Sequence, residues 1–485
     1  MKIDKNIIIG LMLILRPYQS ELLDQTRALM RRGVHSILIQ SPVGSGKTLL
    51  TAFMLKAAAA KGLSSWFCVH RNELLLQSAR AFHAVGLPHS LIAAGYRTDS
   101  QPLVHIASIP TLARRYDHLR PPQLIVWDEC HHLAAKSWAA IARAFPQTFH
   151  IGLSATPQRL DGQGLGAHFQ AMVQGPSVAT LIAQGYLAPY RVYAPPTVTM
   201  EGLHLRMGEF IPAETTQLLD RPAIVGSALA HYQRLASGKR ALIFACSIQH
   251  SQHLVAQFQA AGVRAAHLDG DTDRPQRQET MRRFAQGQLT VLSNVDLFGE
   301  GLDIEGIDVV MLLRPTMSEG LYLQQTGRVL RYAAGKTALI LDHVGSTLRF
   351  GFVDDDRPWS LESKSKHSTN GGPKLAVRLC PACFAAQRPG AVTCRFCGAL
   401  FPLTPREVAQ HEGTLEEIDP ALARLERDRQ AIRAKQEQGR AQGYEQLVAL
   451  GKQRGYKQPA AWAHFILRAR YAKKQQQQAR RLARV

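Results

Sequence analysis

The sequence has no long hydrophobic run. Its most apolar stretch, Ile7–Leu15, is nine residues long, whereas a helix needs about 20 apolar residues to cross a bilayer. Lysines precede this stretch as in a signal peptide, but no small-residue cleavage site follows it. We therefore expect no membrane partner and a cytoplasmic location, associated with the nucleoid if the protein is bacterial. We interpret residues 1–14 as an N-terminal extension, with Met12 as an alternative start.

Cysteine is also scarce. The chain has seven cysteines, and four of them lie between residues 380 and 397. This clustering argues against a secreted disulfide framework and favours a metal site in a reducing compartment. Cys68, Cys130 and Cys246 fall at predicted strands or strand ends, so we interpret them as small buried hydrophobic residues.

Acidic residues are too few to balance the basic ones. The chain has 37 Asp and Glu against 58 Lys and Arg, a formal charge of +21. Residues 421–485 alone hold 16 basic and 4 acidic residues, a charge of +12. Such an excess predicts a polyanionic partner, and it favours nucleic acid over a membrane surface. For the tail taken alone, a solvated basic surface remains the alternative.

What the sequence does contain is an ordinary globular composition and one strong loop motif. A chain of 485 residues, 46% hydrophobic and 20% charged, predicts two or three soluble domains. The motif is residues 41–48, SPVGSGKT, between an apolar strand-like run and an Ala/Leu-rich helical run. It matches G-x-x-x-x-G-K-[ST] except at its first position, where Ser41 replaces glycine. A second GKT at residues 335–337 lacks the preceding glycine loop.

The loop residues suit a phosphate cradle. Backbone N–H groups at a helix N-terminus face an anion, and the helix dipole favours its negative charge. Gly44 and Gly46 allow the close approach, with Ser45 between them, while Lys47 reaches the β- and γ-phosphates and Thr48 ligates Mg²⁺. We therefore predict an ATP and Mg²⁺ site here.

Two acids follow a buried strand about 80 residues beyond this loop. The strand is predicted at 124–127, and Asp128 and Glu129 come directly after it. We expect Asp128 to hold Mg²⁺ through its water shell and Glu129 to orient and deprotonate the attacking water. A lone Asp-Glu pair is normally just an exposed strand end, but the phosphate loop favours the functional interpretation.

Upstream, an Arg-Pro-Tyr-Gln turn at residues 16–19 precedes an amphipathic helical run. The planar amide of Gln19 offers a donor and an acceptor, which suits reading an adenine edge. The other predicted strands of this half are 36–40, 65–69, 103–107 and 149–153, and those of the second half are 241–245, 265–268 and 289–292. Strands alternating with helices at this spacing predict parallel sheets with their chemistry at the carboxyl ends of the strands.

The four cysteines form two C-x₂-C pairs, Cys380 with Cys383 and Cys394 with Cys397. This spacing is typical of a tetrahedral Zn²⁺ site. Four thiolates leave no open coordination position, so we predict a structural zinc that supplies most of the folding energy of a small module.

Taken together, the motifs resemble those of superfamily 2 helicases of the DExH group. The resemblance is carried by residues 16–19, 41–48, 128–131, 154–156 and 324–331. The stretch 153–165, with Arg159, Asp161 and Gly162, resembles the subgroup of type III restriction helicase subunits and RadD-type DNA-repair ATPases. The match covers about residues 15–345.

The resemblance implies two tandem RecA-like domains that share an ATP site. Its last motif, Q-x-x-G-R-x-x-R, ends in Arg328 and Arg331, which we expect on one helix face meeting the γ-phosphate. The resemblance also implies roles for residues elsewhere. Those near the nucleotide are Arg16, Gln19, Gly301 and Asp303; those coupling ATP to movement are His131, Ser154, Thr156 and Gln324; those facing nucleic acid are Arg71, Thr111, Ser247 and Asn294.

We therefore predict an α/β protein with six segments: an extension at 1–14, RecA-like domains at 15–205 and 206–350, a linker at 351–375, a zinc ribbon at 376–403 and a basic helical tail at 404–485. Polar composition defines the linker. In the tail, basic residues alternate with Trp462, Phe465 and Tyr471. This pattern suits base stacking, and equally a small helical bundle whose aromatics form its own core.

The predicted function is ATP-dependent movement on DNA or its unwinding, in repair, recombination or the DNA metabolism of phages and mobile elements. An RNA-directed helicase shares every motif, because no residue here reads the 2′-hydroxyl group unambiguously. A zinc-dependent nucleic-acid-binding switch ATPase without unwinding is the alternative from another class. A protein partner of the ribbon or tail also remains open.

Overall fold

The computed structural model describes residues 13–134, 136–157, 164–194, 204–206, 209–211, 214–216, 220, 222–297, 306–362, 377–388, 390–401, 433, 436–441, 443–454, 459–464, 466–468 and 470–471. These residues fall into two compact units, one ending at Pro402 and one beginning at Leu403. None of the described helices is long and apolar enough to cross a membrane.

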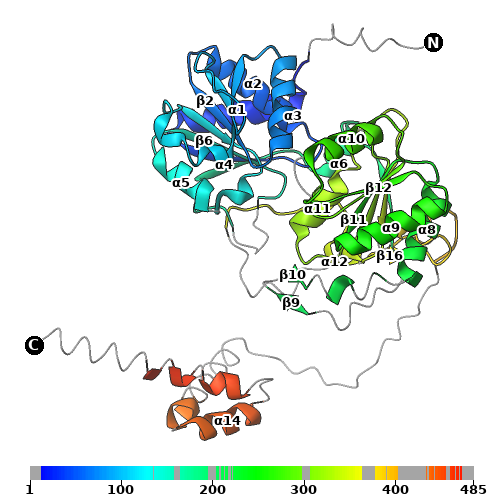
Figure 1. The fold of residues 1–485 in the computed structure, drawn as a ribbon. Helices are drawn as coiled ribbons and strands as arrows, with labels where there is room; N and C mark the ends of the chain where they lie inside the picture. Colours follow the sequence, from blue (N-terminus) through cyan, green and yellow to red (C-terminus); the bar gives the residue numbers. More distant parts are fainter. Residues whose placement is uncertain are drawn as a thin grey trace, which may run out of the picture. The chain divides into compact units, whose positions relative to one another are not determined.

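The first α/β domain, coloured blue to cyan in Figure 1, is built on a parallel sheet ordered β3-β4-β2-β5-β6-β1-β7 in the described residues. Its strands are β1 (Ser36–Gln40), β2 (Ser65–Val69), β3 (His89–Ile92), β4 (Val104–Ser108), β5 (Leu124–Trp127), β6 (Phe149–Ser154) and β7 (Ala171–Gln174). Its helices are α1 (Pro17–Arg31), α2 (Lys47–Ala59), α3 (Asn72–Ala84), α4 (Ile109–Leu112), α5 (Lys136–Ala144) and α6 (Val178–Ala183), with short 3₁₀ turns at Tyr116–His118 and Cys130–Ala134.

Both faces of this sheet are buried, which explains why its strands are apolar throughout. Alternate residues of β1 point to opposite faces: Ile37 and Ile39 pack in one cluster with α1, α2 and α3, and Leu38 packs in another with α4 and α5. The carboxyl ends of β1, β5 and β6 therefore meet at one edge, with helices on both sides holding them in place.

The second domain, green to yellow, has a parallel sheet ordered β12-β13-β11-β14-β15-β8 (Figure 1). Its strands are β8 (Tyr190–Tyr193), β11 (Ala241–Ala245), β12 (Ala265–Leu268), β13 (Val291–Asn294), β14 (Val309–Leu313) and β15 (Ala338–Asp342). Its helices are α8 (Pro222–Ala236), α9 (Ile248–Ala260), α10 (Arg274–Ala285), α11 (Glu319–Gly327) and α12 (Ser346–Phe350), and a small hairpin joins β9 (Leu205–Arg206) to β10 (Glu209–Phe210). Two parallel-sheet α/β domains confirm the predicted fold class.

The predicted boundary between the domains, after residue 205, is wrong. Strand β8 pairs with β15, Tyr190 opposite Ala338, and is therefore an edge strand of the second sheet. The sequence has a Tyr-Arg-Val-Tyr segment at 190–193 that suits a strand, but the strand partner that decides its domain is about 150 residues away.

The predicted linker at 351–375 is also partly wrong. Its first part, residues 351–362, packs on folded structure: Phe352 and Val353 are buried, and the carbonyl of Leu361 accepts a hydrogen bond of 2.8 Å from Gly166 N. Its polar composition predicted a linker, but these polar residues make hydrogen bonds to folded parts of the chain. The rest of the linker, 363–376, lies outside the described residues.

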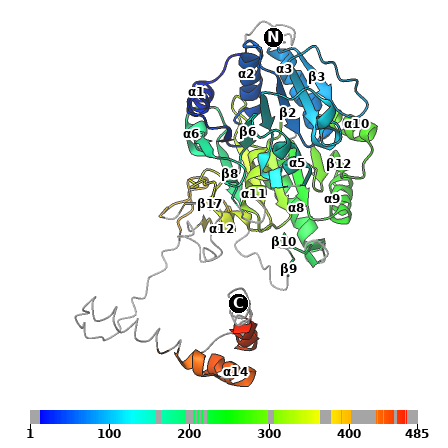
Figure 2. The ribbon, with the colours of Figure 1, turned by 90° about the vertical axis from the view of Figure 1, so that its left-hand side faces the viewer.

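The cysteine module docks on the second domain. It contains the antiparallel pair β16 (Arg378–Leu379) and β17 (Ala386–Gln387), and Figure 2 shows β17 near β8. Tyr193 at the end of β8 bridges to Ala385, and the ring of Phe396 lies 4.8 Å from the guanidinium carbon of Arg191.

The unit that begins at Leu403 is described only in part, and it includes α14 (Tyr444–Gln453). A Cβ placed on Gly451 would lie 3.2 Å from the ring of Trp462, so this tryptophan packs on α14. Leu447 and Ala463 are fully buried, whereas Tyr471 is 67% exposed. For Trp462 this packing favours the helical-bundle alternative over base stacking. Most of the predicted helical tail, 404–485, lies outside the described residues.

Candidate ATP site

The phosphate loop joins the carboxyl end of β1 to the N-terminus of α2. Gly44 and Gly46 have φ angles of +82° and +79°, in the left-handed region that L-residues with side chains rarely adopt. Gly46 is the N-cap of α2, so the first N–H groups of a 13-residue helix face the loop. The Lys47 ammonium group donates to the carbonyls of Ser41, at 3.1 Å, and Pro42, at 3.3 Å.

Ser41, which stands where the motif has its first glycine, has a structural partner inside the loop. Its hydroxyl donates to Ser45 Oγ at 2.7 Å, and that hydroxyl donates in turn to the Pro42 carbonyl at 2.6 Å. Both serines are at least 98% buried. Two hydroxyl groups therefore fix the loop backbone.

Gln19 supports this loop from α1. Its Nε2 donates to the Ser45 carbonyl at 3.0 Å and the Gly46 carbonyl at 3.3 Å, and its Oε1 accepts from Arg16 N at 3.0 Å. The Tyr18 hydroxyl donates to the same Ser45 carbonyl at 2.5 Å. Since the Gln19 amide is used on the loop itself and is 2% exposed, adenine recognition by Gln19 stays a prediction.

The two acids lie at the carboxyl end of β5, with Asp128 8% and Glu129 6% exposed. Burial, together with the neighbouring Glu129 charge, raises the pKa of Asp128 to about 7. Glu129 has a φ of +49°, and its buried Oε2 makes no hydrogen bond with the described residues. His131 Nδ1 lies 3.6 Å from that oxygen. A strained backbone and an oxygen without a hydrogen bond are typical of a site that awaits a ligand.

The second domain brings its arginines to this loop at the end of α11. A Cβ on Gly327 would lie 2.4 Å from Val43 Cβ, and a Cβ on Gly44 would lie 3.7 Å from Arg331 Cγ. Arg328 is 5% exposed, and burial lowers the pKa of Arg331 to about 10.

The expectation that both arginines share one helix face is wrong. Helix α11 ends at Gly327, Arg328 is its C-cap, and Arg331 forms an isolated β-bridge with Leu187. The backbone leaves the helical path after Arg328 because Arg331 pairs with Leu187, which lies in the segment leaving the first domain. The two side chains nevertheless line the same cleft.

That cleft has a volume of about 1390 Å³ and is lined by both domains. Its predicted site residues are Gly44, Gly46, Lys47, Thr48, Asp128, Glu129, Arg328 and Arg331. Burial lowers the pKa of Lys47, the charges of Glu129 and Asp128 oppose this shift, and those of Arg328 and Arg331 add to it. Carboxylates and guanidinium groups from motifs about 200 residues apart thus act on one ammonium group.

Of the predicted coupling residues, Thr156 lies where the domains touch. Ser154 is fully buried, and its hydroxyl donates to the Thr156 carbonyl at 2.8 Å. A Cβ on Gly320, in the first turn of α11, would lie 3.3 Å from Thr156 Oγ1. Gln324, on the same helix, is 2% exposed. Helix α11 therefore lies against the 154–156 loop.

The four residues expected to face nucleic acid have different surroundings. Arg71 donates across the domains to the Leu297 carbonyl at 2.6 Å and the Asp296 carbonyl at 3.2 Å. Asn294 is fully buried and donates to the Ile243 carbonyl at 2.7 Å, so a nucleic-acid strand cannot reach it in this arrangement.

Of the other two, Thr111 is half-buried on α4, and Ser247 caps α9 by accepting from His250 N. Gly301 and Asp303, like Arg159, Asp161 and Gly162, lie outside the described residues.

An ion pair between the two domains has no counterpart in the sequence analysis. Arg277 on α10 forms an ion pair of 2.9 Å with Glu73 on α3. Single charges on two helices carry no pairing signal in one sequence, so only the tertiary arrangement reveals it.

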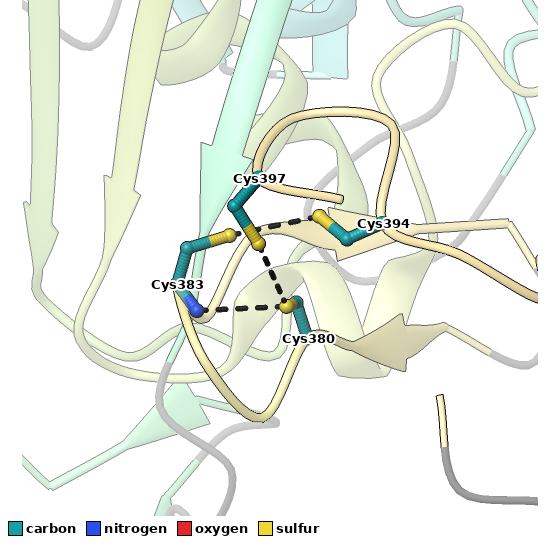
Figure 3. A group of neighbouring side chains, drawn as sticks. All are labelled: Cys380, Cys383, Cys394 and Cys397. Atoms are coloured by element: carbon teal, nitrogen blue, oxygen red, sulfur yellow. Dashed lines mark hydrogen bonds between the residues drawn. The ribbon is translucent and has the colours of Figure 1, made fainter. Parts of the chain in front are cut away.

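The four predicted metal ligands come together, as Figure 3 shows. Their sulfur atoms all lie within 4.8 Å of one another, with 3.5 Å between Cys380 and Cys397 and 3.7 Å between Cys383 and Cys394. Zinc–sulfur bonds of about 2.3 Å in a tetrahedron place sulfurs about 3.8 Å apart. The cluster therefore has the size of a Zn²⁺ site.

The fold is that of two RecA-like α/β domains, and the cleft between them is lined by a phosphate loop, two acids and two arginines. Comparisons with known proteins agree. The family "Type III restriction enzyme, res subunit" matches residues 12–159, and "Helicase conserved C-terminal domain" matches residues 224–333.

Among individual proteins, the "51.5 kDa protein" of Lactococcus phage (isolate 7-9) is 32% identical over 390 residues, which cover 80% of this chain and 83% of the phage protein. The relative named IRC3 in Saccharomyces cerevisiae is 27% identical over 69% of this chain, and the chain spans 52% of its length. The structure of the ATP-dependent Type ISP restriction-modification enzyme LlaBIII bound to DNA shares the fold, with 17% identity and a TM-score of 0.50 over 68% of this chain and 27% of that one.

The chain belongs to the superfamily 2 helicases, in the group of type III restriction enzyme res subunits, and it is a nucleic-acid-dependent ATPase.

Proposed function

We propose that this protein is an ATP-dependent DNA helicase or translocase that hydrolyses ATP between its two RecA-like domains to move on or unwind DNA. The observation that carries the proposal is the single cleft lined by Lys47 and Glu129 of the first domain and by Arg328 and Arg331 of the second. Because hydrolysis needs all four, it is coupled to the closure of the domains.

The residues of the first domain fit a nucleotide with its metal. The α2 N-terminus and the positive-φ glycines suit phosphate oxygens, and Lys47 donates to two loop carbonyls that it can exchange for them. Mg²⁺ prefers oxygen ligands, which Thr48 and Asp128 offer on the same cleft wall. When bound, ATP with Mg²⁺ supplies the phosphoryl group that is cleaved.

The remaining polar groups then have distinct tasks. Glu129, whose buried Oε2 has no hydrogen-bond partner in the described part of the chain, orients a water molecule and takes its proton. Arg328 and Arg331 neutralise charge that develops during phosphoryl transfer, a task worth on the order of 10³-fold or more in rate in related enzymes.

The choice of DNA rests on charge and on likeness. The formal charge of +21 suits a polyanion. The neighbouring restriction enzyme was solved bound to DNA, and restriction enzymes also give the matched family its name. Zinc held by the four cysteines would fix the ribbon against β8, in a closed site without catalytic chemistry.

The test is ATP turnover with single-stranded DNA, duplex DNA, forked DNA and RNA side by side, together with displacement of a labelled strand. We expect stimulation by DNA above that by RNA. Lys47→Ala should abolish turnover, whereas Lys61→Ala, at an exposed lysine just past the end of α2, should leave it unchanged. Stimulation by RNA alone would make the protein an RNA-directed helicase. Turnover with neither strand displacement nor movement would make it a switch ATPase.

A further inference from the structure

Residues 351–362 form a strap that connects three parts of the molecule. At its far end the Leu361 carbonyl accepts from Gly166 N of the first domain at 2.8 Å. Near its start, Asp354 and Asp355 accept from the ribbon residue Arg388 at 3.0 and 2.5 Å. The middle of the strap lies against the second domain, where Arg357 makes its contacts. The strap also lines a small cavity of about 70 Å³ together with Val43 and Thr156.

Arg357 is the residue that holds the strap to α11. Its side chain is 9% exposed, and its Nε donates to Glu319 Oε1 at 2.8 Å. Its Nη1 donates to the Asp355 carbonyl at 2.8 Å, and its Nη2 donates to the Phe352 carbonyl at 3.0 Å. All three guanidinium nitrogens therefore have partners, as a buried charge requires. Lysine could not reproduce this planar set of bonds.

The ion pair between Arg357 and Glu319 matters because of where Glu319 lies on α11. Glu319 is the first residue of α11, whose last residue is Gly327 and whose C-cap is Arg328. A nine-residue helix is a rigid rod about 14 Å long. Fixing its first turn therefore fixes the direction in which its other end meets the phosphate loop.

We propose that Arg357 is a positioning residue for ATP hydrolysis. Through Glu319 it holds α11 at the angle that brings Arg328 and Arg331 to Lys47. This rests on the roles proposed above for those two arginines. Arg357 touches neither substrate nor cofactor; it acts only through the helix.

The test is steady-state ATP turnover of Arg357→Ala, with rates expressed per nucleotide-binding site so that misfolded protein does not count. A misplacement of about 1 Å at an active site can cost about 100-fold in rate, so we expect kcat to fall at least about tenfold. KM should change less than about twofold, because the phosphate loop is intact. If kcat per site stays within about twofold of wild type, Arg357 does not position α11.

Coupling to the arginines separates positioning from general destabilisation. In an Arg328→Ala/Arg331→Ala background, Arg357→Ala should reduce the residual kcat by less than about twofold, since both groups that it positions are already gone. A full and multiplicative loss in that background would overturn the proposal.

Two matched variants complete the design. Leu254→Ala opens a cavity in the separate core beneath α9 and should lower the melting temperature without changing kcat per site. Glu319→Ala removes the acceptor of Arg357 Nε but leaves the carbonyl contacts of Arg357 intact, so it should fold even if Arg357→Ala does not. It should still lower kcat several-fold, and an unchanged kcat would again refute the positioning role.

These outcomes are distinct from a failure of the proposed function. If wild type and Leu254→Ala show no ATP turnover with any nucleic acid, the proposed function itself fails. If both turn over ATP and the Arg357 and Glu319 variants match them, only the positioning role fails.

Discussion

Gly327→Ala tests whether ATP is hydrolysed while α11 packs against the phosphate loop as it does in this structure. Gly327 is the last residue of α11, and an added Cβ would lie 2.4 Å from Val43 Cβ, 2.9 Å from its Cγ1 and 3.0 Å from its Cγ2. Carbon atoms normally meet at about 3.5–4.0 Å. The helix would have to retreat from the phosphate loop by roughly 1 Å.

The magnitude follows from the cost of overpacking. An extra methyl group in a well-packed contact costs about 1–3 kcal/mol. If that cost falls on the closed state alone, the closure equilibrium drops by roughly 5- to 150-fold. Alanine favours helix by about 1 kcal/mol over glycine, so the second domain itself should not be destabilised.

The assay is nucleic-acid-stimulated ATP turnover together with a melting curve. We expect kcat to fall about 10- to 100-fold with an unchanged or higher melting temperature. Gly439→Ala is the matched control, because Gly439 is an exposed helical glycine with no atom within 4 Å of its added Cβ. Val43→Gly combined with Gly327→Ala should recover part of the rate, since the opposing side chain is removed. Turnover of Gly327→Ala within about twofold of wild type would show that α11 does not meet the loop this way during hydrolysis.

Three further predictions follow from single sites. Glu129→Gln should stop turnover yet retain ATP, because the base is lost and the phosphate loop is not; a normal rate in a phosphate-release assay would exclude Glu129 as the base. Elemental analysis of wild type should find one zinc per chain, and Cys394→Ser should abolish it, with loss of up to ~10 kcal/mol of folding energy from the ribbon; wild type purified without chelator and lacking zinc would contradict the metal site. Burial lowers the pKa of His250 from 6.5 to about 4, so the unfolded chain binds more protons than the folded protein below pH 6.5. The contribution of His250 to stability should therefore fall by about 3 kcal/mol as the pH drops from 6.5 towards 4. Urea titrations at pH 7 and pH 5 should show that His250→Gln loses less stability, or gains more, than wild type between the two pH values.

Local sequence was enough wherever chemistry depends on consecutive residues. The phosphate loop requires positive φ at Gly44 and Gly46, and only glycine adopts it readily. The C-x₂-C pairs at 380 and 394 bring their thiols together within single tight turns. In both cases the spacing along the chain already sets the geometry.

Local sequence failed wherever a partner far along the chain decided the outcome. Strand β8 belongs to the second sheet because it pairs with β15. Asn294 was predicted to face nucleic acid, yet its side-chain amide donates to the Ile243 carbonyl in the neighbouring β-strand. The residues of the strap look like a linker because their composition is polar, whereas the partners that fix them, Gly166, Arg388 and Glu319, lie elsewhere along the chain.

The sequence by itself therefore determined the reaction class and the inventory of the site: a phosphate loop, two acids, two arginines and four thiols. Only the tertiary structure decided how these parts act together. It ended α11 at Gly327 and paired Arg331 with Leu187, and it placed Arg357 on Glu319. The physical reason is that composition and spacing fix short-range geometry, whereas the relative placement of two domains depends on packing and charge pairing between residues that no local pattern connects.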